Sequence, residues 1–344
     1  MLNKQELKKL TVLLSGQKRI VLTTHTNPDG DAIGSSMALL HYFEKKGHTV
    51  SALVPNDFPE FLSWIPGSEK MIVFEKKSKA AKKLLEKADI VFCLDFNALS
   101  RVGSMSETLK NVKVPFVLID HHIDPEMESF AFVHSTVQIS STSELVFDFI
   151  SRLDDLELID KQIAECLYTG IVTDTGSFSF SANNSNTYRI TAELIDRGLV
   201  PDKIHQLIYD TFSENRLRLL GMGISDRMLV WNDLHTALIY YTAQDLEKYN
   251  EQVGDTEGVV NYPLSMKNIN LAVLLTERDK NIRISFRSKG DFSVNDLARK
   301  HFNGGGHKNA AGGKSFISMK ETIELVKSEL SNYKKQLDYQ LTYS

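Results

Sequence analysis

Acidic and imidazole side chains gather in one short segment of the sequence, His25-Thr-Asn-Pro-Asp29-Gly-Asp31. The segment follows an apolar run and precedes a helical pattern. Taken alone, Pro28-Asp29-Gly30 is typical of a turn, and Asp31 is typical of a helix N-cap. An imidazole and two carboxylates are also donors that a divalent cation accepts. The segment by itself therefore leaves two interpretations open, a structural turn and part of a metal site.

Three further apolar runs end in residues that can bind a cation, and these ends are Asp95, then Asp120-His121-His122, then Asp174. Ligands of open α/β sheets bind at the carboxyl ends of the strands, so we expect these groups to meet in one crevice. Carboxylates brought together in this way repel one another unless a cation lies between them. Taken alone, Asp174 is also consistent with the solvated end of a helix. Carboxylate and imidazole ligands without thiolate suit manganese or magnesium better than a structural zinc.

The elements that must position these groups follow from the period of the apolar residues. Short β-rich runs alternate with helical patterns through the first half of the chain, which predicts a doubly wound α/β domain with a mainly parallel sheet and helices on both faces. The predicted strands are 19–24, 49–54, 90–94 and 116–119. The predicted helices are 32–46, 78–87, 143–153, 161–173 and 187–197, the last ending at Gly198.

The second half of the chain has a different pattern. A helix is predicted over 213–230, and strand-like runs follow at 234–241, 269–276 and 282–287. We therefore predict a metal-binding catalytic domain over 1–212, a linker helix over 213–230, and a smaller α/β domain over 231–344. The last domain contains a glycine-rich stretch, 303–313, and ends in an amphipathic helix from about Lys320.

The composition excludes several classes of function. The 344 residues include 40 Lys and Arg against 44 Asp and Glu, and the formal net charge of -4 gives no reason to expect binding to a long nucleic acid. Cys93 and Cys166 lack metal-type spacing and are expected to be reduced core residues. Neither a secretory signal nor a membrane-spanning run is found, so we expect a cytoplasmic protein without a membrane partner. The oligomeric state stays open between a monomer and a homodimer.

The sequence resembles the DHH superfamily of phosphoesterases, which is named for the tripeptide found here as Asp120-His121-His122. All four acidic and imidazole segments occur in the order of that family. The stretch Gly304-Gly-Gly-His307-Lys-Asn-Ala-Ala-Gly-Gly313 resembles the signature of the DHH-associated domain. The resemblance spans nearly the whole chain, and within the superfamily it is strongest to the branch of nanoRNases and phosphatases of 3′-phosphoadenosine 5′-phosphate.

The resemblance implies a role for each group. One metal ion would be bound by His25, Asp29 and Asp95. A second would be bound by Asp31, Asp95, His121 and Asp174, so that Asp95 bridges the pair. His122 would face the substrate phosphate as a catalytic residue, and Asp120 would orient its neighbours by hydrogen bonds. The two divalent ions, Mn²⁺ with Mg²⁺ as the alternative, would lower the pKa of a shared water and so supply a hydroxide nucleophile.

The second domain is expected to recognise the substrate. Strand alternation over 282–287 places Arg283, Ser285 and Arg287 on one face, where a guanidinium could grip a terminal phosphate or simply be solvated. The resemblance favours Arg287 over Arg283. The remaining candidates for substrate binding are Gly305 and Gly306, which allow close approach of the backbone, His307, which follows them, and Arg101, which either reaches a phosphate or caps its own segment.

The leading hypothesis is a hydrolase of small nucleotides or short single-stranded oligonucleotides, namely nanoRNA, linear dinucleotides and 3′-phosphoadenosine 5′-phosphate. The main alternative is a cyclic-dinucleotide phosphodiesterase. A single-strand DNA exonuclease would carry further nucleic-acid-binding domains and a basic, aromatic channel, and an inorganic pyrophosphatase would carry a different C-terminal motif. From another class, a non-catalytic nucleotide sensor is disfavoured, because every expected metal position holds a competent side chain.

Overall fold

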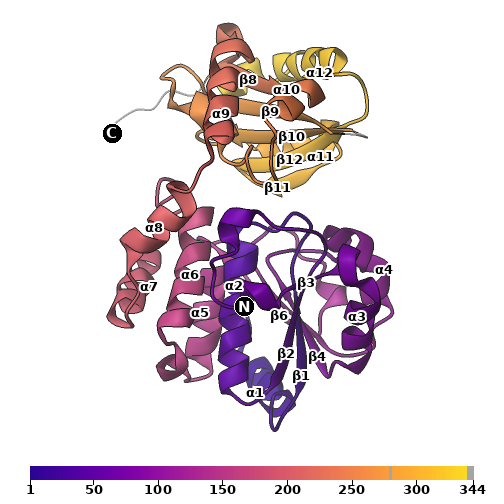
Figure 1. Ribbon diagram of the computed structural model, residues 1–344, viewed down its shortest axis with the longest axis vertical. Helices are drawn as coiled ribbons and strands as arrows, with labels where there is room; N and C mark the ends of the chain where they lie inside the picture. The colour runs from indigo at the N-terminus through magenta and orange to yellow at the C-terminus, as the bar shows by residue number, and fades with distance from the viewer. Residues whose placement is uncertain (279–280, 339–344) are drawn as a thin grey trace. The chain divides into compact units, whose positions relative to one another are not determined.

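The computed structural model describes residues 1–278 and 281–338, and the chain forms two compact units, Met1–Thr211 and Phe212–Ser344. The first unit contains a six-stranded sheet in the order β3-β2-β1-β4-β5-β6, in which all neighbouring strands are parallel (Figure 1). The strands are β1 (Arg19–Thr23), β2 (Thr49–Val54), β3 (Ile72–Val73), β4 (Ile90–Leu94), β5 (Phe116–Asp120) and β6 (Phe132–Ser135). The predicted doubly wound parallel sheet is confirmed.

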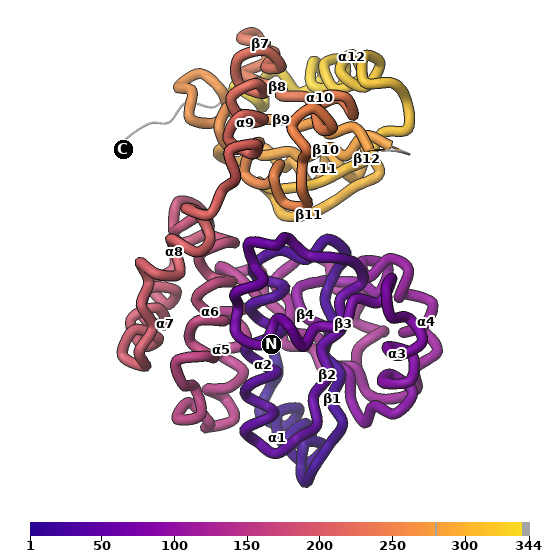
Figure 2. The backbone as a smooth tube through the Cα atoms, in the orientation of Figure 1, coloured from indigo at the N-terminus to yellow at the C-terminus, as the bar shows by residue number. Residues whose placement is uncertain are grey.

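Helices cover both faces of this sheet (Figures 1 and 2). One face carries α1 (Lys4–Leu13), α2 (Gly30–Lys45), α5 (Thr142–Arg152) and α6 (Lys161–Asp174), and the other carries α3 (Phe74–Lys87) and α4 (Ser106–Lys110). The alternation of side chains along β1 explains both layers, because Ile20 and Leu22 pack on the α2 side while Val21 packs on the α3 side. The central strands β4 and β5 are buried at every residue because helices cover both faces of the sheet.

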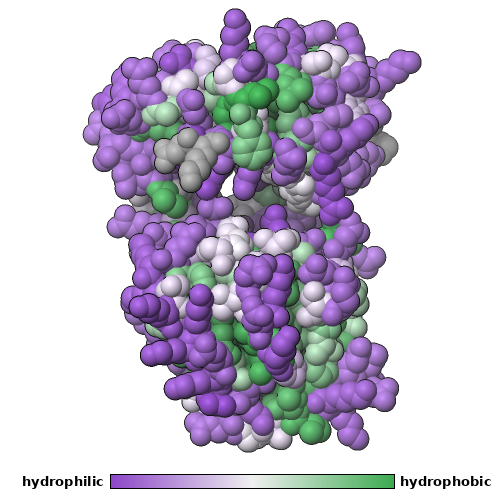
Figure 3. All heavy atoms as spheres, turned by 90° about the vertical axis from the view of Figure 1, so that its right-hand side faces the viewer, coloured by the Kyte–Doolittle hydropathy of each residue, from purple (hydrophilic) through white to green (hydrophobic). Residues whose placement is uncertain are grey.

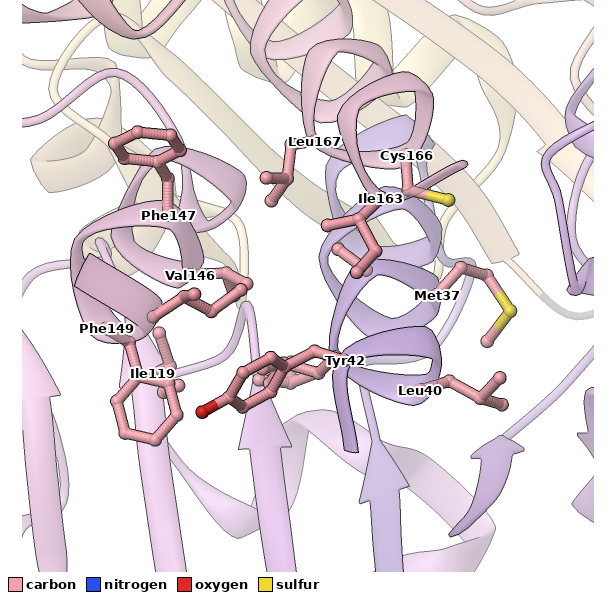
Figure 4. Packing of buried hydrophobic residues seen from close by; sticks show 14 of the residues in the cluster. Met37, Leu40, Tyr42, Ile119, Val146, Phe147, Phe149, Ile163, Cys166 and Leu167 are labelled. Atoms are coloured by element: carbon pink, nitrogen blue, oxygen red, sulfur yellow. The ribbon is translucent and has the colours of Figure 1, made fainter. Parts of the chain in front are cut away.

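The core beside α2, α5 and α6 fixes the helix ends that reach the candidate site. Figure 4 shows Tyr42 of α2, Phe149 of α5 and Ile163 of α6 packed together above the sheet. Each such side chain contributes about 1.5–3 kcal/mol on full burial. Two shorter helices, α7 (Ser185–Asp196) and α8 (Pro201–Tyr209), follow and pack against α6. As predicted, α7 is followed by Gly198 in a left-handed conformation, with φ of 93°.

The second unit begins with α9 (Glu214–Asp226) and contains a second sheet in the order β11-β12-β10-β9-β8-β7. The strands are β7 (Met228–Trp231), β8 (Thr236–Tyr241), β9 (Leu271–Arg278), β10 (Asn281–Ser288), β11 (Gly305–His307) and β12 (Ala310–Ser315), and only β8 and β9 pair in parallel. Helices α11 (Val294–His301), α12 (Met319–Ser331) and the short α13 (Lys334–Leu337) pack on one face, and α9 packs on the other face with the short α10 (Ala243–Lys248).

The helix predicted over 213–230 is shorter in the structure. It ends at Asp226, and Met228 already belongs to β7, which pairs with β8. The run Met-Leu-Val-Trp prefers a strand once an antiparallel partner is present, and this tertiary preference overrides the helical pattern. Leu219 and Met222 pack on Ile239 and Tyr241, so α9 is part of the core of the second unit. The assignment of separate roles to the two units stays a prediction.

The surface and the cysteines agree with the composition. Figure 3 shows a largely hydrophilic face, and the lysines of α3 are exposed. None of the described helices is long and apolar enough to cross a lipid bilayer. Cys93 and Cys166 are both buried and unpaired, as expected.

Candidate metal centre

The predicted ligands lie at the carboxyl edge of the first sheet, where the strand order reverses. Strands β1 and β4 are neighbours there, and the chain leaves them in opposite directions along the sheet. His25 follows β1, Asp95 follows β4, and Asp120 is the last residue of β5. Such a switch point is the usual ligand-binding position in an open parallel sheet.

The predicted metal ligands form two groups that share Asp95. In the first group, His25 Nε2 lies 3.3 Å from Asp95 Oδ2 and 4.0 Å from Asp29 Oδ1. In the second, His121 Nε2 lies 3.6 Å from Asp95 Oδ1, 3.9 Å from Asp31 Oδ2 and 3.3 Å from Asp174 Oδ2. One oxygen of Asp95 thus faces each group. The fold brings all of the predicted ligands together.

The backbone presents Asp95 by an unusual conformation. Its φ is 63°, in the left-handed region that costs a non-glycine residue about 1–2 kcal/mol. The turn is held because the amide of Asp95 donates to the carbonyl of Ile119, and the side-chain amide of Asn97 donates to the carbonyl of Ile123 at 2.7 Å. These bonds tie the loop after β4 to β5 and to the loop that follows it.

The N-cap residue of α2 differs from the one that the sequence suggested. The N-cap of α2 is Asp29, whose Oδ1 accepts hydrogen bonds from the amides of Asp31 and Ala32, both at 3.1 Å. Asp31 was the expected N-cap, but it lies in the first turn and is only 1% exposed. A buried carboxylate needs hydrogen-bond donors or a cation nearby. An ordinary turn would not provide these for Asp31.

Hydrogen bonds through Nδ1 orient the rings of His25 and His122. His25 donates from Nδ1 to the carbonyl of Thr26 at 2.9 Å, which directs Nε2 to Asp95. His122 Nδ1 lies 2.7 Å from Asp120 Oδ1, and Asp120 is fully buried. Asp120 therefore orients the ring of His122, in the way that carboxylates orient metal-site histidines.

A close crossing of α2 and α6 brings Asp31 and Asp174 into the same site. A Cβ atom on Gly170 would collide with Asp31 Oδ1 and with Ser143 Oγ, and one on Gly34 would collide with the carbonyl of Cys166. The two helices can approach this closely only because both positions are glycine. Thr169-Gly170, one turn before Asp174, was a possible signal for this role, but the spacing of the residues alone did not reveal it.

Two residues that contact the predicted ligands were not among the residues predicted from the sequence. The amide of Thr142 donates to Asp31 Oδ2 at 2.6 Å, the amide of Ser143 donates to Asp31 Oδ1 at 2.8 Å, and Thr142 Oγ1 donates to Asp95 Oδ1 at 2.9 Å. Both residues open α5, one residue earlier than predicted. The signal was present in Ser141 followed three residues later by Glu144, which marks a helix N-terminus and hence an anion-binding end.

The electrostatics of the site favour an added cation. Burial and the Asp95 carboxylate raise the pKa of Asp31 well above its usual range, against hydrogen bonds from Ser143. Burial also disfavours the charge on Asp95, but the hydrogen bond with His25 and the nearby histidines hold its pKa below the usual range. Burial would lower the pKa of His25, yet Asp95 and Asp29 raise that pKa to about 9. Either a protonated imidazole or a metal cation supplies positive charge that stabilises these clustered carboxylates.

The donors present also fit such a cation. Ligand atoms of His25, Asp29 and Asp95 lie within 4.8 Å of one another, as do those of Asp31, Asp95 and His121. Burial lowers the pKa of His121, which favours the neutral imidazole that a metal requires. Carboxylate oxygens with imidazole nitrogens suit Mn²⁺ and Mg²⁺.

Arg101 lies beside this centre. Its carbonyl accepts hydrogen bonds from the amide and from the hydroxyl of Thr26, at 2.9 and 3.1 Å. Gly103, with φ of 53°, allows this approach, because a Cβ there would collide with Thr26 Cγ2. Among the described residues, the half-buried guanidinium of Arg101 makes no ion pair.

The other predicted substrate-binding residues lie in the second unit. In β10, Arg287 has Ala310 and Ala272 opposite it, and Ser285 has Gly312 and Leu274 opposite it. Ala310 also pairs with His307, so Arg287 and His307 flank one small residue. Gly305 pairs with Gly312, and Gly306, with φ of 153°, donates its amide to Asn295 Oδ1 at 2.8 Å. Arg283 is the more exposed arginine of β10.

Comparison with known proteins gives the family. Residues 19–171 match the model of the DHH family, N-terminal domain, and residues 236–332 match the DHHA1 domain. The chain is 30% identical over 306 residues to the bifunctional oligoribonuclease and PAP phosphatase NrnA of Thermus thermophilus, covering 88% of this chain and 85% of that one. The chain therefore belongs to the DHH family of phosphoesterases.

Two solved structures show the same fold. An exopolyphosphatase-related protein from Bacteroides fragilis is 41% identical, with a TM-score of 0.93 and coverage of 98% of both chains. RecJ from Thermus thermophilus, solved in complex with Mn²⁺, has a TM-score of 0.54 at 14% identity and covers 97% of this chain and 55% of its own. The second likeness shows the fold alone.

Proposed function

We propose that this protein is a metal-dependent hydrolase of short oligoribonucleotides and of 3′-phosphoadenosine 5′-phosphate. The observation that carries the proposal is the geometry around Asp95, whose two oxygens face two separate groups of carboxylate and imidazole donors. His25, Asp29 and Asp95 would hold one divalent cation. Asp31, Asp95, His121 and Asp174 would hold the other.

Mn²⁺ is the proposed ion, with Mg²⁺ as the alternative, because the ligands are carboxylates and imidazoles. When bound, the two cations would lower the pKa of an attacking water and offset the charge of the phosphate. The unpaired, buried thiols of Cys93 and Cys166 are in keeping with action in the reducing cytoplasm.

The protein's own groups would then position and protonate the substrate. Asp120 holds His122 through Nδ1, so the ring is fixed before the substrate binds. We assign to His122 the role of donating a hydrogen bond or proton as negative charge develops on the phosphoryl oxygens or on the leaving oxygen. Arg101, whose backbone is bonded to Thr26 beside the metal ligands, is assigned to a substrate phosphate.

The substrate assignment rests on the relative and on the second sheet. NrnA of Thermus thermophilus, by its name, acts on oligoribonucleotides and on PAP. In this chain, Arg287 lies between two alanines on its sheet face, with Ser285 two residues away. We propose that Arg287 grips a terminal phosphate bidentately, with Ser285, His307 and the backbone at Gly305 and Gly306 completing the recognition.

A substrate panel tests the proposal. The protein would be incubated with Mn²⁺ and with 3′-phosphoadenosine 5′-phosphate, RNA of two to five nucleotides, long DNA, a cyclic dinucleotide or pyrophosphate. We expect release of phosphate or mononucleotide from the first two substrates and loss of both activities with a chelator. Hydrolysis of the cyclic dinucleotide or of pyrophosphate alone would overturn the substrate assignment. Binding without turnover would identify a sensor instead of an enzyme.

A further inference from the structure

A short segment at the start of α5, residues 140–144, holds two of the proposed metal ligands, and we call it the carboxylate cradle. Thr142 contacts both ligands, through its amide to Asp31 and through its hydroxyl to Asp95. Ser143 adds a second amide to Asp31. All three donated bonds are between 2.6 and 2.9 Å long, and every residue of the cradle is buried.

The cradle is itself anchored by a buried carboxylate. Glu144 is fully buried, and its Oε2 accepts hydrogen bonds from the amide and hydroxyl of Ser140 and from Thr187 Oγ1. Its Oε1 accepts from the side-chain amide of Asn186. Since Asn186 and Thr187 lie in the first turn of α7, the cradle is fixed between two helix N-termini. Because four donors reach this buried carboxyl group, it supports the cradle rigidly.

From these contacts we propose that Thr142 is a positioning residue of the metal centre. Its hydroxyl orients the shared carboxylate of Asp95, its amide and that of Ser143 orient Asp31, and Glu144 keeps the cradle in place. This inference rests on the proposed function, because it concerns the same cations. It adds a residue outside the proposed ligand set, which the spacing of the ligands in the sequence does not indicate.

The physical reason is the freedom of a carboxylate that two cations must share. A hydrogen bond from Thr142 to Asp95 Oδ1 occupies one lone pair and fixes the rotation of the carboxyl group, while the other lone pair stays directed into the site. The N-terminus of α5 adds partial positive charge next to Asp31, which lessens the repulsion between two buried carboxylates. Groups that orient metal ligands in this way are typically worth about 10–100-fold in metal affinity.

The test compares variants of the full chain by Mn²⁺ binding instead of turnover. Thr142→Val removes the hydroxyl and keeps the shape and the amide. Thr142→Ser keeps the hydroxyl and serves as the rescue. Thr322→Val is the matched control, since Thr322 is also fully buried, pairs through its hydroxyl with Ser315 Oγ at 2.8 Å, and belongs to the second unit. Affinity would be measured by calorimetry, and the environment of bound Mn²⁺ by electron paramagnetic resonance.

We expect Thr142→Val to weaken Mn²⁺ binding by about 10-fold or more and to change the resonance spectrum. Thr142→Ser and Thr322→Val should bind as the unmodified protein does. If Thr142→Val does not fold, Thr142→Ala is compared with Thr142→Ser in the same way. Unchanged affinity in the valine or alanine variant would overturn the inference while leaving the proposed function intact. An unmodified protein that binds Mn²⁺ but hydrolyses no nucleotide would overturn the function and not this role of Thr142.

Discussion

The two units place their charged groups in opposite ways. At the edge of the first sheet, Asp31, Asp95 and His121 are buried, and backbone or side-chain donors fix the two carboxylates. On β10 of the second sheet, Arg287 and Ser285 are half-buried, and their partners on β12 are the small residues Ala310 and Gly312. Groups that must share cations need fixed geometry, whereas an arginine that recognises a phosphate needs room and retains some adaptability.

The largest effect should come from the group that the two ligand sets share. Asp95→Asn keeps the shape but removes a negative charge from both sets, so we expect kcat/KM to fall by more than about 100-fold, beyond the cost of losing a group that only orients a ligand. Steady-state kinetics with a short RNA would measure it. Asp89→Asn is the control, because Asp89 forms a surface ion pair with Arg19 and should leave kcat/KM unchanged. If Asp95→Asn kept activity near that of the unmodified protein, the two ligand sets would not depend on a shared carboxylate at Asp95.

Gly170→Ala tests whether the candidate metal centre of the first unit tolerates an added methyl group. Helix propensity alone favours alanine by about 1 kcal/mol in the middle of a helix. We expect the opposite sign, a loss of about 1–3 kcal/mol of unfolding free energy together with weaker Mn²⁺ binding, because the new methyl group would collide with Asp31 and Ser143. Urea unfolding and a Mn²⁺ titration measure the two effects. A more stable variant with normal metal affinity would show that α6 has room beside the site.

Arg287→Ala tests whether Arg287 serves substrate binding and not metal binding. Loss of charged hydrogen bonds to a phosphate, about 1.5–3 kcal/mol, corresponds to a fall of roughly 10–150-fold in kcat/KM, carried mainly by KM. Mn²⁺ affinity should not change. Arg287→Lys should recover only part of the loss, since an ammonium cannot form the two parallel bonds of a guanidinium. Arg283→Ala is the comparison on the same face. A larger effect at Arg283 than at Arg287 would reverse the assignment.

Gly221→Ala should have the smallest effect, and a favourable one. Gly221 lies in α9, and a Cβ at this position would meet no atom within 4 Å. We therefore expect a gain of up to about 1 kcal/mol in unfolding free energy, with kcat/KM and metal affinity unchanged. Thermal unfolding would measure it. A destabilised variant would indicate that this part of α9 is packed more tightly than its surroundings show.

The sequence predicted which carboxylates and imidazoles lie together better than it predicted the groups that hold them in place. His25, Asp95 and His121 were found because apolar strands end directly before them or close to them, and parallel strand ends must meet at one edge. Thr142 and Gly170 were missed because their roles depend on how α5 and α6 approach α2, which no local pattern encodes. A glycine or threonine in a helix has many uses, and only the packed neighbours select one.

The same distinction holds for the fold. The long central strands of the first sheet were predicted because burial on both faces makes them continuously apolar. The edge strands β3 and β6 were not predicted. Each pairs along one side only and is partly buried, so its sequence shows a weaker strand pattern. Strands β11 and β12 were taken only as a glycine-rich stretch, because glycine carries little strand propensity and the pairing with β10 decides their conformation.

The most direct test is a crystal of the full chain grown with Mn²⁺, in which anomalous scattering locates the metal. We expect two anomalous peaks about 3.5–4 Å apart, with one oxygen of Asp95 nearest to each. One peak should have His25 and Asp29 as neighbours, and the other Asp31, His121 and Asp174. Peaks that lie away from Asp95 would contradict this prediction. So would the absence of any anomalous peak at this edge of the sheet at a saturating Mn²⁺ concentration.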